Sequence, residues 1–188
     1  MILLIMIMLF VLAIILPLIG YYFKPYSKLT AAIFIFSPLV FILVIAGWWI
    51  LATNHYFVSS TNLEYEYIGE FHLQETITEK QLEALGSFTK RENEDGYSYE
   101  IQGSFLSTDL KRKVVSISAY EIPLETTSGL KVGDNIEKAK QIYGSHHYSY
   151  HEMGLGKAVV YIDRINKHRL TIWTEDEHTV SNIWLDVY

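Results

Sequence analysis

The sequence predicts an α+β protein: two N-terminal transmembrane helices, then a tandem helix-plus-antiparallel-meander domain. Three observations lead to this fold class. The chain has 15 basic and 21 acidic residues, yet before Glu64 the only charged side chains are Lys24 and Lys28. Beyond that point, two stretches (71–86 and 129–144) each have the pattern of a helix ended by glycine. Segments in which apolar and polar residues alternate follow both stretches, as expected for half-buried strands.

Residues 1–53 are predicted to form a transmembrane helical hairpin with spans at about 2–20 and 29–51. Each run is uncharged and long enough to cross a bilayer as a helix. A cleaved signal peptide is the alternative for the first run. It lacks a basic leading region, is long for a signal peptide, and is followed by no clear small-residue cleavage site, so we expect two retained helices.

The two lysines between the spans predict the orientation. Loops that carry lysine stay cytoplasmic, and no lysine or arginine follows the second span closely. We therefore expect a multi-pass protein of the cell membrane, in contact with the lipid bilayer, whose two termini and C-terminal domain are extracytoplasmic.

After a linker at 54–63, a first α+β repeat is predicted over 64–122. Its helix has Thr76 as the N-cap and Glu79 at the third position, and it ends at Gly86. A turn at 93–96 leads to a strand with alternating Tyr97, Tyr99 and Ile101. A second turn is expected at 107–109, and a longer strand at 114–122.

A second repeat is predicted over 123–188. Asp134 is the expected N-cap of its helix, Glu137 completes a capping box, and Gly144 ends the helix. Four strands are expected at 146–152, 157–163, 168–174 and 179–187. VSISAYEI (115–122) matches VSNIWLDV (180–187), and a longer hairpin in the second repeat would explain why the offset between the repeats grows from 58 (144 − 86) to 65 (180 − 115).

A glycine turn, a capped helix ending in Tyr143–Gly144 and a β-meander resemble the β-lactamase-inhibitor-protein-like (BLIP-like) fold. The small lipoproteins of outer-membrane assembly have a related architecture. The resemblance covers about residues 65–188 and implies a binding module without catalytic residues. It does not imply inhibition of a β-lactamase, because the contact residues of that inhibitor are not matched.

The histidines of HHYSYHE (His146–Glu152) raise the question of a metal. His147 and His151 share one face of the predicted strand, but a metal normally needs three or four ligands, so whether His146, His147 and His151 bind one stays open. GLGK at 154–157 is too short for a phosphate loop and suits a hairpin turn. We assign no catalytic residue, no metal site and no cofactor, and expect no enzyme.

The domain beyond residue 63 carries a net charge of −8 (13 − 21), which suits it poorly to nucleic acid. Tyr148, Tyr150 and Trp173 lie on predicted strands and are the expected partner-binding residues, because large aromatics are favoured at protein interfaces. The sequence thus predicts an extracytoplasmic module that binds another envelope protein or an extracellular ligand. An accessory subunit of a transporter or sensor, and a metal-binding envelope protein, are the alternatives.

Overall fold

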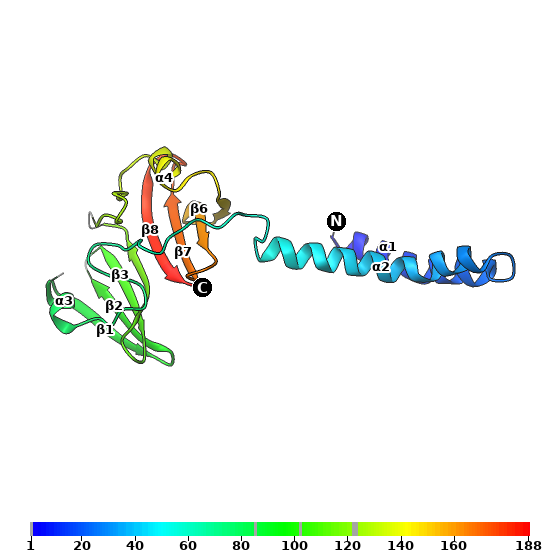
Figure 1. Ribbon diagram of the computed structural model, residues 1–188, viewed down its shortest axis with the longest axis horizontal. Coiled ribbons are helices and arrows are strands. Elements are labelled where there is room, and N and C mark those ends of the chain that lie inside the picture. The colour runs from blue at the N-terminus through cyan, green and yellow to red at the C-terminus, as the bar shows by residue number, and fades with distance from the viewer. Residues whose placement is uncertain (1, 85, 102, 122–123) are drawn as a thin grey trace. The chain divides into compact units, whose positions relative to one another are not determined.

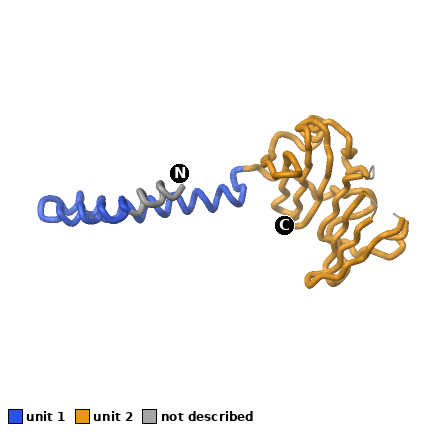
Figure 2. Tube along the Cα trace, turned by 180° about the vertical axis from the view of Figure 1, so that it is seen from behind, with its two compact units in different colours: residues 1–57 blue, residues 58–188 orange. Residues whose placement is uncertain are grey.

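The structure is a computed structural model that describes residues 2–84, 86–101, 103–121 and 124–188, with side chains described from Val11 onward. The chain divides into two compact units, residues 1–57 and 58–188 (Figure 2). The division follows the composition, since the first unit holds the uncharged runs and the second holds every acidic residue. Each unit is described by itself.

The first unit contains α1 (Ile2–Phe23) and α2 (Lys28–Thr53), which lie side by side (Figure 1). They approach closely at Gly20, where an added Cβ would be 2.8 Å from the carbonyl oxygen of Ala31. The side chain of Ser27 caps α2 by accepting from the Thr30 amide. Among the described residues, α2 is the one helix long and apolar enough to cross a membrane, and Val11–Phe23 is a shorter apolar helix.

In the described part of the second unit, eight strands form one antiparallel sheet in the order β1-β2-β3-β4-β8-β7-β6-β5 (Figure 1). Helix α3 (Glu79–Ala84) precedes the first four strands and α4 (Ile136–Tyr143) the others. The strands are β1 (Phe88–Asn93), β2 (Gly96–Ile101), β3 (Ser104–Asp109), β4 (Val114–Ala119), β5 (Tyr148–Glu152), β6 (Gly156–Asp163), β7 (His168–Thr174) and β8 (Val180–Val187). The fold is therefore α+β, as predicted.

The main core lies on the sheet face that packs against α3 and α4. Leu82 of α3 and Ile136, Ala139 and Tyr143 of α4 belong to the same buried cluster as alternate residues of the strands. Those strand residues include Tyr99, Leu106, Ile117, Tyr161, Ile172 and Ile183. Since all of them project from one side of the sheet, both helices of this unit, α3 and α4, lie on that side.

Equivalent hydrogen bonds join each helix-leading segment to the last strand of its meander. The amide of Gln74 donates to the carbonyl of Val114 at 2.7 Å, and the amide of Gly133 donates to that of Val180 at 2.8 Å. Both donors have positive φ, 65° for Gln74 and 92° for Gly133. The separation between equivalent residues grows from 59 (133 − 74) to 66 (180 − 114).

The longer hairpin predicted in the second meander is confirmed and accounts for most of this growth. The β2–β3 hairpin spans 14 residues (96–109), whereas the β6–β7 hairpin spans 19 (156–174). The sequence match that aligned Val115 with Val180 is one residue out of register. The hydrogen-bond acceptor equivalent to Val180 is Val114, not Val115. The matched segments themselves are β4 and β8, which pair at the middle of the sheet.

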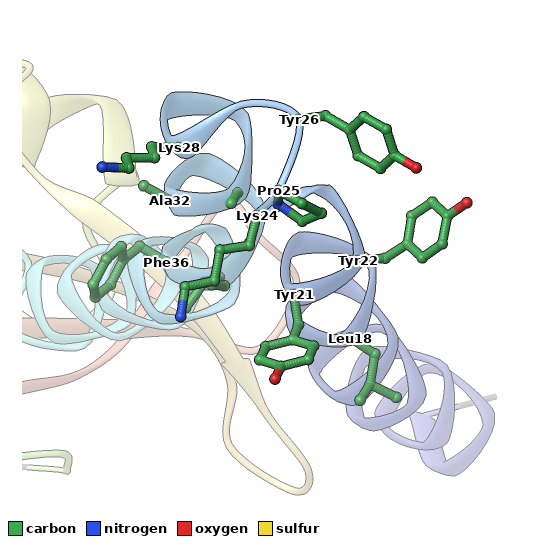
Figure 3. Close-up of a pocket in the computed structure, with 11 residues that line it drawn as sticks. Leu18, Tyr21, Tyr22, Lys24, Pro25, Tyr26, Lys28, Ala32 and Phe36 are labelled. Carbon is green, nitrogen blue, oxygen red and sulfur yellow. The ribbon is translucent and has the colours of Figure 1, made fainter.

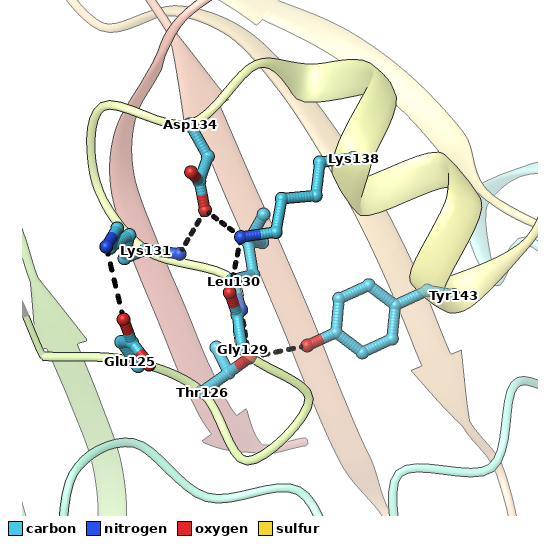
Figure 4. A network of polar contacts seen from close by, with 8 residues as sticks. All are labelled: Glu125, Thr126, Gly129, Leu130, Lys131, Asp134, Lys138 and Tyr143. Carbon is cyan, nitrogen blue, oxygen red and sulfur yellow. Dashed lines mark hydrogen bonds and ion pairs between the residues drawn. The ribbon is translucent and has the colours of Figure 1, made fainter.

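Both predicted helix caps are wrong by one or two residues. Asn135 caps α4, accepting from the Glu137 amide at 2.8 Å, because Asp134 is occupied elsewhere. The Asp134 carboxylate accepts from the Lys131 amide and from Lys138 Nζ, which also donates to the Gly129 carbonyl (Figure 4).

In the first meander, Thr78 takes the position expected of Thr76. Its hydroxyl accepts from the Gln81 amide, and Gln81 Oε1 accepts from the Thr78 amide at 2.9 Å, which is a reciprocal capping box. The predicted turn at 107–109 is also wrong, because these residues end strand β3, where Thr108 is buried. Strand β1 was not predicted.

The segment expected as a linker, 54–63, is packed on the second unit from Val58 onward. The Thr61 amide donates to the Ile162 carbonyl at 2.9 Å, and Leu63 is 1% exposed. The Leu63 amide donates to the buried carboxylate of Asp163 at 2.8 Å. This hydrogen bond fixes residues 58–63, which we call the strap, to the end of β6. The folded unit therefore begins before the predicted repeat.

Candidate protein-binding face

A second, smaller apolar cluster lies on the side of the sheet away from α3 and α4. It consists of Ala158, Val160, Ile162 and Trp173, with Tyr148 packed against it. The neighbours of these residues in β6 and β7, Val159, Tyr161, Leu170 and Ile172, belong to the main core. Successive residues of β6 and β7 thus belong to different clusters, one on each face of the sheet. The second meander therefore has apolar side chains on both faces, as in strands covered on both sides.

Tyr148, Tyr150 and Trp173 lie together on this face. The rings of Tyr148 and Tyr150 stack with centroids 6.2 Å apart, and Tyr150 meets Trp173 edge to face at 5.4 Å. Tyr150 is 40% exposed, whereas Trp173 is 4% exposed. Burial raises the pKa of both tyrosines. Trp173 thus forms the floor beneath Tyr150 and is not itself a free contact surface.

The adjoining strands add an ion pair and a second exposed aromatic. Arg169 of β7 and Asp186 of β8 are register partners, and Arg169 Nε donates to Asp186 Oδ1 at 3.0 Å in a bidentate pair. This hydrogen bond raises the pKa of Arg169. Trp184 is 40% exposed, and its indole Nε1 donates to the Ser116 hydroxyl of β4.

We call this surface the open sheet face, and it comprises Tyr148, Tyr150, Arg169, Trp173, Trp184 and Asp186. Its exposed side chains are Tyr, Trp and Arg, the types that dominate binding energy at protein interfaces. Each is held by a neighbour, so little side-chain freedom would be lost on binding. Arg169 and Asp186 were not among the predicted site residues, although the alternation that places Trp173 on this face also places Arg169 there.

The histidines of the 146–152 segment do not converge. His147 lies on the core side, with its ring 5.4 Å from that of Tyr161, and burial followed by the charge of Lys140 lowers its pKa. His151 Nε2 is 3.6 Å from Glu177 Oε1, and His146 is exposed. Across the described ranges, no three His, Cys, Asp or Glu side chains gather in a group that could hold a metal ion.

Comparison with known proteins identifies no family. No protein-family model matches the chain, and no curated protein matches it. One solved structure is similar, that of an extracellular protein containing an SCP domain from Bacillus anthracis, with a TM-score of 0.39 and 8% sequence identity. The match covers 61% of this chain and 46% of that protein, so the chain spans less than half of its length.

Proposed function

We propose that this chain is a membrane-anchored extracytoplasmic module that binds another envelope protein through the open sheet face and catalyses no reaction. The observation that carries the proposal is the set of Tyr150, Trp184 and Arg169 on a sheet surface that neither α3 nor α4 covers. Exposed aromatics beside a fixed guanidinium supply large contact area at low entropic cost.

The anchoring half of the proposal assigns both α1 and α2 to the bilayer. α2 alone has the required length and apolar composition among the described residues, and α1 runs alongside it in the same hairpin. The cationic turn between the helices supports a cytoplasmic position for that turn and an extracytoplasmic position for the domain.

The BLIP-like resemblance belongs to the same proposal. The equivalent hydrogen bonds at Gln74 and Gly133, and the central pairing of β4 with β8, support a tandem arrangement of the two meanders. In that arrangement one continuous sheet surface, covered by neither α3 nor α4, is available to a partner.

Site-specific photocrosslinking in cells tests the binding face. A photoreactive residue at position 150 or 184 is expected to give a defined crosslinked product with a membrane or envelope protein. The same residue at Gln141, which is exposed on α4, serves as the control on the opposite face. Equal products from all three positions, or products from Gln141 alone, would place binding elsewhere.

A further inference from the structure

We propose that the cytoplasm-facing end of the helical hairpin holds the headgroup of an anionic phospholipid. The proposal rests on the membrane anchoring given under Proposed function, and concerns a site separate from the open sheet face. A groove at this end is lined by residues from the end of α1, the connecting turn and the start of α2 (Figure 3). The turn lies within one compact unit, so the groove is a feature of the hairpin itself.

The cationic part of the groove is formed by Lys24 and Lys28. In Figure 3 their side chains lie on the same side of the turn, with Ala32 and Phe36 nearby, whereas Tyr22 and Tyr26 point the other way. Residues 1–57 contain no Asp or Glu, so no carboxylate within this unit neutralises the two ammonium groups. A phosphodiester is an anion that two neighbouring ammonium groups can bind together.

The rest of the lining is apolar and extends along the helices away from the turn. Lys28, Ala32 and Phe36 are spaced four residues apart, so they follow one face of α2 over about 12 Å. On α1, Leu18 and Tyr21 also line the groove, and the Tyr21 ring centroid is 5.8 Å from Lys24 Nζ. Between these residues the two helices approach closely at Gly20 and Ala31.

The order of the cationic and apolar parts of the groove matches the headgroup and acyl chains of a phospholipid in a bilayer. The two cations lie at the turn, where the headgroup layer would be, and the apolar lining continues toward the bilayer interior as an acyl chain does. Basic pockets between transmembrane helices on the cytoplasmic side recognise anionic headgroups for this reason. Ala32 lines this apolar part with a small side chain.

Native mass spectrometry of the purified full chain tests the proposal. The protein is offered equal amounts of phosphatidylglycerol and phosphatidylethanolamine with identical acyl chains. We expect preferential retention of phosphatidylglycerol, reduced roughly fivefold for each lysine removed in K24A/K28A. K24R/K28R should keep the preference, and K111A/K113A, which removes two lysines from another turn, is the matched control. Ala32→Leu, which fills the groove but leaves both lysines, should reduce retention of the lipid.

Two results would overturn the proposal. One is an unchanged lipid preference in K24A/K28A, and the other is displacement of the lipid by millimolar inorganic phosphate, which would indicate a simple anion site. Alkaline extraction of membranes separates this failure from that of the anchoring. A wild-type chain that is extracted with carbonate would refute anchoring itself, whereas a chain that stays in the membrane without lipid preference would refute only the headgroup site.

Discussion

The two tryptophans of the open sheet face have different environments and should respond differently to substitution. Trp184→Ala removes an exposed ring with one hydrogen bond to Ser116, so it should cost about 1 kcal/mol or less in the free energy of unfolding and abolish partner capture. Trp173→Ala leaves a cavity in the second cluster and should cost about 3–5 kcal/mol. Thermal unfolding of the full chain in detergent, followed by near-ultraviolet circular dichroism, measures both. Equal destabilisation by the two substitutions would contradict the distinction.

Asp163 is a buried carboxylate that holds the strap to the sheet. It accepts from the amides of Leu63, Ile165 and Asn166 and from the Asn166 side chain. Burial opposes ionisation, but these hydrogen bonds, led by that of the Asn166 side chain, outweigh it and hold the pKa of Asp163 below its ordinary value. Asp163→Asn replaces an acceptor by a donor facing other donors, and we expect a loss of about 2–3 kcal/mol.

The pH dependence of stability gives an independent test of Asp163. Because its pKa is lower in the folded chain than the ordinary 3.8, its contribution is complete above that value and is lost as pH falls through the lowered folded pKa. Unfolding of the wild type should therefore become easier in acid, and the Asp163→Asn variant should show a shallower acid dependence. Parallel acid limbs for the two chains would mean that this carboxylate is not linked to folding.

Helix α4 shows how a cap and an ion pair can be told apart. Asn135→Ala removes the actual N-cap and should cost about 0.5–2 kcal/mol at every pH. Asp134→Ala removes the acceptor for Lys131 and Lys138, and its effect should shrink in acid. Burial alone would raise the pKa of Asp134, but the hydrogen bond from Lys138 and further contacts with Lys131 lower it. The stabilisation by the Asp134 carboxylate is therefore lost as pH falls through this lowered pKa and the carboxylate is protonated.

Unfolding curves of both variants at neutral and acidic pH provide the measurement. A pH-dependent loss in Asn135→Ala, or a constant loss in Asp134→Ala, would reverse the two roles. From the sequence we predict Asp134 as the N-cap, but by residue preference Asn135 is an equally good one. In the structure Asp134 instead pairs with Lys138. That ion pair depends on the loop at Gly129, whose carbonyl also accepts from Lys138 Nζ.

Glycine has a corresponding place in both meanders. An added Cβ at Gly96 would lie 1.9 Å from the carbonyl oxygen of Thr108, and one at Gly156 would lie 2.3 Å from that of Thr174. At each site the third strand of the meander has a β-bulge at the threonine. The close backbone approach at the first residue of β2 and β6 therefore requires glycine.

Gly156→Ala and Gly154→Ala form a matched pair that tests this requirement. Both glycines have φ near 85°, but an added Cβ at Gly154 meets nothing within 4 Å. Gly154→Ala should cost about 1 kcal/mol through backbone strain alone, and Gly156→Ala clearly more, because strain and backbone overlap add. Denaturation of the two variants measures the difference. Equal costs would show that the β6–β7 pair moves apart without penalty.

The strands of the second meander were predicted closely, whereas in the first meander only β2 and β4 were predicted. In β8, alternation of apolar and polar side chains marks the buried face, and in β6 an uninterrupted apolar run marks the strand. The ends of β6, β7 and β8 fall within a residue of prediction. β1 has the sequence FTKREN and is largely exposed at the sheet edge, so it lacks any such signal. Ser107–Asp109 has turn-forming residues, and only pairing with β2 and β4 makes it a strand.

The open sheet face was predicted in part for a related reason. Period-two alternation is local and correctly placed Tyr148, Tyr150 and Trp173 on one side of their strands. Exposure is not local, because Trp173 is covered by the ring of Tyr150 from another strand. The pairing of Arg169 with Asp186 likewise depends on the register of β7 against β8, which the sequence does not specify.

At the scale of the whole molecule, the chain leaves little free linker between its two units. α2 ends at Thr53, and Arg164 donates to the carbonyl of Val58, the first residue of the second unit. Residues 54–57 span at most about 14 Å when fully extended. The tether between α2 and the second unit is therefore only four residues long.

Membrane topology is the last prediction, and the sequence makes it easy to test because the chain contains no cysteine. Single cysteines are introduced at Tyr26, which is 75% exposed in the α1–α2 turn, and at Met153, which is 99% exposed in the β5–β6 turn. Tyr26 is preferred to the neighbouring Ser27 because the Ser27 hydroxyl caps α2. Neither position takes part in a cap or an ion pair, so both substitutions should leave folding unchanged.

With both helices spanning the membrane and the lysine turn in the cytoplasm, an impermeant maleimide applied to intact cells should label Cys at position 153 and not at position 26. Permeabilised cells should show labelling at both, which controls for accessibility. Labelling at position 26 alone would invert the orientation, because the domain would then be cytoplasmic. Labelling at both positions in intact cells would mean that α2 does not cross the bilayer, since the turn and the domain would then share the outer side.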